Sequence, residues 1–331
     1  MSSIFTSLAT GFCATSTEIV LGYSQPEGVG SVLFPEVEHP TGMGKIPKYG
    51  DRNFEAMDTR RSPFADSNET MPEKGQYIDI AVTEHDLSIP MDEAQQQMLE
   101  QAPVNGLAKD YLDVKKQNAK LAMSIIKNGH EYEAASLAQT LTTYPAAART
   151  SLATTYQWDE PAATTTAVPL KDIDTYILEP VRKAVGRRPN VLVFGAEAWS
   201  LFKNHPSVLA LFPNLDGFVT PDMIMGKNVY PHVKRIVVGE SVIASQYGTS
   251  KADVWTEYVI GAYVNMDDPS TIDIRQPSFG YTIRPKKTQY TQYPYVDTYL
   301  STNKKVHFTR VTDMYQVKVT MNDAGAIMKI K

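Results

Sequence analysis

The chain has 331 residues and a formal net charge of −5; 42% of its residues are hydrophobic and 21% are charged. This length can bury a substantial core in one large domain or in two or three small ones. The negative balance excludes a protein held to nucleic acid by its overall charge, and the single cysteine, Cys13, excludes an internal disulfide and favours a reducing place of synthesis. No apolar run reaches the roughly 18 residues of a membrane span, so no membrane partner is expected.

The first third of the chain contains little that could form a core of its own. Val29 to Val37 predicts an extended segment, and His39 to Gly75 is rich in glycine, proline and charged residues. Weak alternation from Met71 to Pro90 predicts one or two strands of a hairpin. Long irregular stretches are usually functional or disordered, and disordered ones are poor in aromatic residues. Aromatic residues recur here, so we expect this region to become ordered by lying on neighbouring subunits.

Three segments follow in the middle of the chain. A long helix is predicted from Leu107 to Leu141, with Asn105 as its N-cap and apolar residues at helical spacing. Gly129 weakens this helix by about 1 kcal/mol relative to alanine, so a kink or break is expected there. Residues 145–169 predict a loop or linker because they are rich in alanine, threonine and proline. Asp172 to Val185 predicts a second helix with one apolar face.

The most informative run lies between Arg187 and Phe212 and reads RRPNVLVFGAEAWSLFKNHPSVLALF. Val191 to Phe194 predicts a buried strand, Gly195 a tight turn, and the following residues a helix that ends near Pro206. A turn between a strand and a helix can hold a nucleophile or a phosphate. The run lacks the G-x-S-x-G, G-K-[ST] and G-x-G-x-x-G patterns, so it predicts neither kind of site.

The last third of the chain reads as a series of strands. They are predicted at Ile236–Val242, Val254–Val264, Phe279–Ile283, Val296–Leu300, Val306–Val311 and Tyr315–Thr320, with a further β pattern at Ile272 and Ile274. An acidic turn is predicted between Asn265 and Ser270. Together with the two helices, these strands predict a mixed α+β protein.

Side chains that catalyse reactions or bind metals form no clear group. The six histidines lack metal-ligand spacing, Cys13 has no evident partner as a nucleophile, and no cofactor is predicted. Two weaker patterns remain. Asp159, Glu197 and His205 could form the scattered site of a soluble α/β enzyme. Arg284, with nearby lysines and tyrosines, could bind single-stranded nucleic acid.

The order of these segments resembles that of the major capsid proteins of tailed bacteriophages. In those proteins a Pro-Asn pair precedes a strand, a glycine turn, a helix with a tryptophan and a His-Pro pair. The matching residues here are Pro189, Asn190, Gly195, Trp199, His205 and Pro206. The resemblance covers nearly the whole chain from residue 28, through Lys45–Gly50, Arg60–Pro63, Tyr132–Ala135, Trp158–Asp159, Pro277–Tyr281 and Val311–Asp313. No single piece is specific, but their order is.

The resemblance implies a coat subunit with five regions. These are an N-terminal arm (1–40), an extended β-hairpin loop (41–103), a peripheral domain with a spine helix (104–160), an axial domain (161–275) and the C-terminal β-layer of the peripheral domain (276–331). The arm and the loop are implied to contact neighbouring subunits. The residues expected at this interface are Phe34, Arg60, Arg61, Phe64 and Tyr77.

The implied function is self-assembly without catalysis. Subunits would form hexamers and pentamers that close into an icosahedral shell around double-stranded DNA, without sequence-specific binding. Scaffolding, portal and decoration proteins would be further partners, and the virion, assembled in the cytoplasm of a bacterial host, the implied location. Two alternatives stay open: the shell of an encapsulin-like nanocompartment that encloses protein cargo, and the soluble α/β enzyme.

Overall fold

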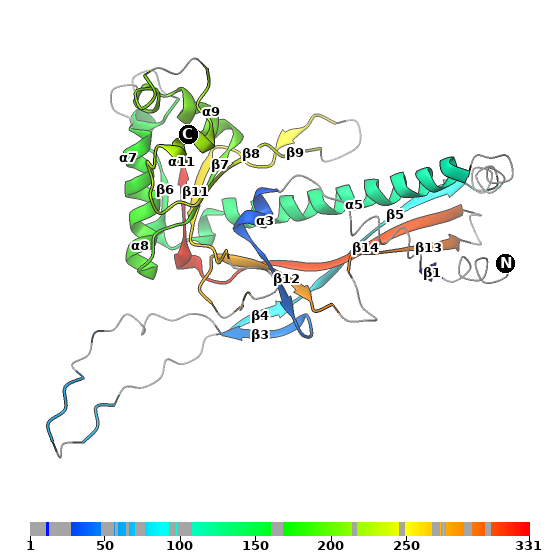
Figure 1. The fold of residues 1–331 in the computed structure, drawn as a ribbon, viewed down its shortest axis with the longest axis horizontal. Helices are drawn as coiled ribbons and strands as arrows, with labels where there is room; N and C mark the ends of the chain where they lie inside the picture. The colour runs from blue at the N-terminus through cyan, green and yellow to red at the C-terminus, as the bar shows by residue number, and fades with distance from the viewer. Residues whose placement is uncertain are drawn as a thin grey trace.

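The computed structural model describes residues 11–12, 28–47, 56, 59–63, 66–69, 77–92, 97, 108–159, 168–213, 217–244, 249–266, 272, 274, 276–287, 293–301 and 306–331. At one end of the molecule, a sheet and several helices form a part that we call the body. A long helix extends from it along a second sheet, which we call the long sheet (Figure 1). Within the described ranges, no helix is both long and apolar enough to cross a bilayer.

The body is built on a five-stranded sheet. In spatial order its strands are β6 (Arg149–Ser151), β15 (Gly325–Lys329), β11 (Tyr258–Ala262), β7 (Val191–Gly195) and β8 (Arg235–Gly239). Strand β11 is antiparallel to β15 and β7, whereas β8 is parallel to β7 and β6 to β15. Every residue of β7 is buried, which explains its continuous apolar sequence, because a strand covered on both faces needs no polar side.

Helices surround this sheet (Figure 1). They are α7 (Pro169–Ile173), a π-helical turn (Asp174–Leu178), α8 (Glu179–Val185), α9 (Ala196–Asn204), α10 (Pro206–Leu209) and α11 (Pro221–Gly226). The predicted strand, glycine turn and helix are confirmed, because Gly195 ends β7 and α9 begins at the next residue. Short 3-10 turns lie at Leu141–Thr143, Ala146–Ala148, Thr154–Tyr156 and Asn322–Ala324, and a small ribbon pairs β9 (Val242–Ile243) with β10 (Ala252–Asp253).

The long sheet has six strands. They are β1 (Gly11–Phe12), β13 (Tyr295–Ser301), β14 (Val306–Val319), β12 (Gly280–Pro285) and β2 (Glu36–His39), with β5 (Thr83–Asp92) also paired to β14. The two strands predicted within residues 306–320 are one continuous strand, β14. Ile272 and Ile274 lie outside strands, contrary to the prediction. Strand β15 carries no alternation, since four of its five residues are buried, and the sequence did not predict it.

Helix α5 (Ala108–Gln139) lies along the long sheet and confirms the predicted long helix (Figure 1). The helix continues through Gly129, so the expected break is absent. Its inner face is lined by the fully buried alanines Ala119, Ala122, Ala134 and Ala138. Small side chains there allow the helix backbone to approach its neighbours closely.

The N-terminal part differs most from the sequence-based prediction. Residues 29–33 form a helix, α3 (Val29–Leu33), rather than an extended segment, and β2 then pairs in parallel with β12. Residues 71–90 contain two strands: β4 (Tyr77–Ala81) forms an antiparallel hairpin with β3 (Met43–Pro47), as the prediction of one hairpin strand allows, and β5 pairs with β14. A small apolar cluster lies at the base of this hairpin: Val37, Ile46, Ile80, Val82, Tyr281 and Ile283. Residues 28–39, called the N-terminal segment below, therefore pack within their own subunit.

Candidate assembly site

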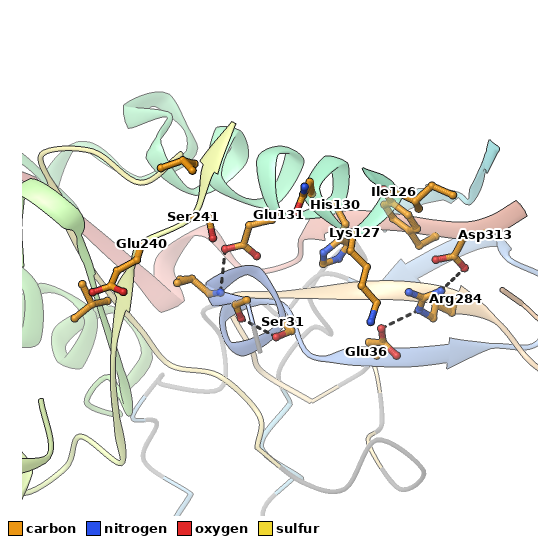
Figure 2. Close-up of a pocket in the computed structure, with 16 residues that line it drawn as sticks. Ser31, Glu36, Ile126, Lys127, His130, Glu131, Glu240, Ser241, Arg284 and Asp313 are labelled. Carbon is orange, nitrogen blue, oxygen red and sulfur yellow. Dashed lines mark hydrogen bonds and ion pairs between the residues drawn. The ribbon is translucent and has the colours of Figure 1, made fainter. Parts of the chain in front are cut away.

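A cavity of about 570 Å³ lies where the N-terminal segment meets α5 (Figure 2). Its walls come from α3, the middle of α5, the connection between β8 and β9, and strands β12 and β14. Charged side chains of both signs line it, among them Glu36, Lys127, Glu131, Arg284 and Asp313. The contacts of these groups determine how the front of the chain is held.

Glu131 holds the start of α3. Its carboxylate accepts hydrogen bonds from the backbone N–H groups of Val29 and Gly30, each at 2.9 Å, and from the indole Nε1 of Trp255 at 2.7 Å. The first N–H groups of a helix have no partner within the helix, and the helix dipole favours a negative charge at that end. Glu131 thus supplies from α5 the cap that α3 lacks in its own sequence, and Trp255 connects the same carboxylate to the body.

Glycine makes this close approach possible. A Cβ atom on Gly30 would lie 2.8 Å from the Cβ of Ala134 and 2.8 Å from Glu131 Oε2. Real Cβ atoms do not approach other atoms so closely, so a larger residue would push α3 off α5. Gly30 is therefore required by the close packing of the start of α3 against α5.

Thr282 connects the end of α3 to α5. Its hydroxyl donates to the carbonyl oxygen of Phe34 at 2.9 Å, and its Oγ1 lies 3.0 Å from Nε2 of His130. A hydroxyl has one hydrogen to donate. Since Thr282 gives that hydrogen to Phe34, the imidazole must be the donor in its contact, which places a proton on Nε2 of His130.

The surroundings of His130 keep it neutral. Burial, together with the positive charge of Arg284, lowers the pKa of His130 to about 4. Its ring lies at 76° to that of Tyr315, with ring centroids 5.0 Å apart, and His85 stacks on Tyr315 at 4.1 Å. Burial also lowers the pKa of Lys127, one turn away on α5. Added positive charge is therefore costly on this side of the cavity.

Arg284 joins three strands through one guanidinium group. Its Nε donates to Glu36 at 3.0 Å and its Nη1 to Asp313 at 2.6 Å, so β12 is connected to β2 and β14 (Figure 2). Asp313 is almost fully buried. Burial alone would lower the pKa of Arg284, but Glu36 and Asp313 outweigh that effect and raise it above the usual range. Arg284 and Asp313 form a buried ion pair whose partners depend on one another, while the Glu36 side chain is about half exposed.

The charged groups of the cavity connect parts of one and the same chain. None of the predicted interface residues that the structure describes lines this cavity. The structure places Phe34 in the core of the subunit, fully buried and 5.5 Å from the ring of Phe279, so its side chain cannot reach a neighbour as predicted. Arg60 and Arg61 are exposed, and the carbonyl of Arg60 accepts a hydrogen bond from Asn68. Tyr77, which opens β4, is 62% exposed. Phe64 lies outside the described residues.

The three residues of the alternative enzyme hypothesis, Asp159, Glu197 and His205, make ion pairs or hydrogen bonds within the subunit. Lys331 Nζ lies 2.8 Å from Glu197 and 3.7 Å from Asp159, so one ammonium group pairs with both carboxylates. His205 Nδ1 accepts the backbone N–H of Ser207 and so caps α10. Across the described ranges, no group of three or more histidine, cysteine or acidic residues could hold a metal ion.

The residues that hold the N-terminal segment were missed by reasoning from sequence. Glu131 was not singled out as a candidate site residue, His130 appeared only among the histidines that lack metal-ligand spacing, and Arg284 appeared only as a candidate contact to nucleic acid. In the structure that guanidinium is occupied by two carboxylates. One signal could have pointed to Glu131. It lies within the predicted long helix, and a carboxylate that faces the protein interior needs hydrogen-bond donors buried beside it.

Two solved structures share this fold. A phage-related protein from Bordetella bronchiseptica RB50 aligns with a TM-score of 0.73 and 23% identity, over 97% of this chain and 98% of that one. A protein described as a prophage capsid protein of E. coli CFT073 aligns with a TM-score of 0.58 and 13% identity, over 95% of both chains. The fold is therefore that of phage capsid proteins.

Sequence similarity narrows this class to a family. No protein-family model matches the chain, but the major capsid protein of Burkholderia phage BcepMu is 31% identical over 318 residues, which is 94% of each chain. The chain thus belongs to the phage major capsid proteins. The resemblance in the sequence is confirmed, and the protein is a structural subunit of a self-assembling shell rather than an enzyme.

Proposed function

We propose that this major capsid protein forms hexamers and pentamers that close into an icosahedral shell around double-stranded DNA. The observation that carries the proposal is the 31% identity to a phage major capsid protein across nearly the full length of both chains. The overall charge of −5 supports enclosure of DNA without tight binding to it.

In this proposal the chain has five working regions: residues 1–40 as the arm, 41–103 as the extended loop, 104–160 and 276–331 as the peripheral domain, and 161–275 as the axial domain. The division into body and long sheet supports it, with α5 as the spine helix. The body also takes in β6 and β15, which come from the neighbouring regions. Because Phe34 is buried, the arm's contribution to the interface excludes that side chain.

Arg60, Arg61, Phe64 and Tyr77 are the proposed interface residues of the loop. The exposure of Arg60, Arg61 and Tyr77 supports this role. Arginine suits it because its guanidinium can pair with a carboxylate of a neighbour through two hydrogen bonds. Portal, scaffolding and decoration proteins are the further proposed partners, and the virion, assembled in the cytoplasm of the host, the proposed location.

Purified protein tests the function directly. Sedimentation and negative-stain imaging should show closed shells tens of nanometres wide, and virions should contain nuclease-protected DNA. A small oligomer, or shells filled only with protein, would reject the proposal. The double variant Arg60→Ala/Arg61→Ala should remain folded but form few closed shells. Lys286→Ala/Lys287→Ala, another adjacent pair of exposed cations, is the control and should assemble normally.

A further inference from the structure

The outer face of α5 is unusually apolar for a helix at the surface. Leu121 is 54%, Ile125 47% and Tyr132 55% exposed. Together with Gly129 they follow one another at spacings of four, four and three residues, so they form a single row along the helix. We call this row the α5 stripe. The opposite face of α5 is also apolar and is buried by the protein. A helix that is apolar on both sides is normally covered on both sides.

Gly129 adds a second sign that the stripe has a partner. Glycine inside a helix costs stability relative to alanine. At Gly30 in α3, glycine is needed because a Cβ atom would collide with α5. A Cβ atom on Gly129 would meet nothing within 4 Å. Nothing in the described part of the subunit therefore requires a residue without a Cβ atom at position 129. The missing side chain leaves a notch in the surface between Ile125 and Tyr132, where a second backbone can approach closely.

We infer that the α5 stripe binds the α5 stripe of a second copy of this chain, with the two helices antiparallel around a two-fold axis. Such a contact is made by the same surface on both partners, so each residue must fit the residue at the matching position of the reversed stripe. In one register, Ile125 lies opposite the notch at Gly129 of the second copy, and Leu121 lies opposite Tyr132 of the second copy. A protruding side chain therefore meets a gap, and an aliphatic side chain meets an aromatic ring.

The charges of α5 agree with a second copy as the partner. A contact of identical surfaces brings like charges together wherever the surface is charged, but the stripe has no charged residue. Among residues 116–139, Lys120 is the one exposed charged residue, and it lies about 100° around the helix from Leu121 and about 140° from Ile125, away from the stripe. In the proposed register the two Lys120 positions lie about 20 Å apart along the helix axis, beyond the roughly 10 Å over which exposed charges interact in salt. A strongly acidic or basic partner would find no matching charge on the stripe itself.

The contact is too small to hold two free subunits together. The stripe extends for about 17 Å along the helix, and an interface of a single helix face is well below the area of a stable dimer. Within a shell, other contacts raise the effective concentration of the second stripe, so a weak contact is formed repeatedly. This inference rests on the proposed shell function and adds to it a specific contact between subunits.

Substitution of Gly129 separates folding from assembly. Gly129→Ala should raise the thermal midpoint of the subunit by about 2 °C, because alanine favours the helix and its Cβ meets no atom. Gly129→Leu fills the notch completely and should reduce the yield of closed shells by about tenfold or more, with the helical circular dichroism of the subunit unchanged. The matched control is Gly226, an exposed glycine of α11 whose Cβ would also meet nothing. Gly226→Leu should assemble normally.

Disulfide cross-linking identifies the partner. In a Cys13→Ser background, subunits with Ile125→Cys are mixed with subunits carrying Gly129→Cys and assembled. Oxidation of the mixed shells should give a disulfide-linked dimer of the two variants. Shells made of either variant alone should give less of the disulfide-linked dimer. Cross-linking of Ile125→Cys to a different polypeptide, or a normal shell yield from Gly129→Leu, would overturn the inference. Failure of the unmodified chain to form shells would instead reject the proposed function.

Discussion

Replacement of Glu131 should detach the N-terminal segment from the rest of the subunit. Its carboxylate accepts the N–H groups of Val29 and Gly30 and the indole N–H of Trp255. A hydrogen bond to a charged group contributes about 1.5–3 kcal/mol net, and a buried donor left without a partner costs about 1–3 kcal/mol. Because the three bonds share one carboxylate, their contributions do not add in full, and we expect Glu131→Ala to lower the free energy of unfolding by about 3–5 kcal/mol.

Glu131→Gln is the more discriminating change. Oε1 accepts from both Val29 and Trp255, whereas Oε2 accepts from Gly30. Glutamine keeps one oxygen and turns an NH₂ group toward the third donor, so one contact becomes repulsive. The expected loss is about 1–3 kcal/mol. Urea unfolding of unassembled subunits measures it, and hydrogen exchange at residues 29–33 locates it.

The control for both variants is Ser136→Ala, at an exposed position on the same helix. It should change stability by less than about 0.5 kcal/mol. If Glu131→Gln behaved like this control and the amides of α3 kept their protection, the carboxylate would not be what holds α3, and the account of the N-terminal segment would be wrong.

Three further changes test the same region. His130 has a pKa of about 4 in the folded chain against 6.5 when free, so the unfolded chain takes up a proton first as the pH falls, and the free energy of unfolding should drop by up to roughly 3 kcal/mol between those values. The drop should be absent in His130→Gln when unfolding is measured across the same pH series. Arg284→Leu leaves Asp313 buried without its partner and should cost about 3–5 kcal/mol, whereas Arg284→Lys keeps the charge and should cost less in the same urea titration. Gly30→Ala should cost about 1–3 kcal/mol through overpacking against α5 and speed hydrogen exchange in α3; unchanged exchange would show that the close approach is unnecessary.

Elements with a strong local pattern could be predicted from sequence. A continuous apolar run bounded by glycine predicted β7 and the start of α9, and helix-forming residues at regular spacing predicted α5. The break expected at Gly129 did not occur, because packing of α5 on the long sheet outweighs the small cost of one glycine. Tertiary pairing likewise explains why residues 306–319 form a single strand, since β12, β13 and β5 all pair with β14 along its length.

The N-terminal segment could not be predicted in the same way. Val29–Leu33 is too short to form a helix by itself, and α3 exists because Glu131, far away in the sequence, caps it. Phe34 was predicted to lie at the interface because its covering residues are also far away in the sequence. An aromatic residue in an irregular stretch must be covered by something, but the sequence does not say whether its own subunit or a neighbour covers it.

By itself, the sequence determined the family and the elements whose residues repeat with a helix or strand period, because those depend on neighbours in the chain. The tertiary structure alone decided which buried charges meet, which strands pair and which apolar residues stay uncovered. Glu131, Arg284 and the stripe on α5 acquire their roles from partners that lie many residues away or on another subunit. Such partners are set by the packing of the whole fold, and no local pattern records them.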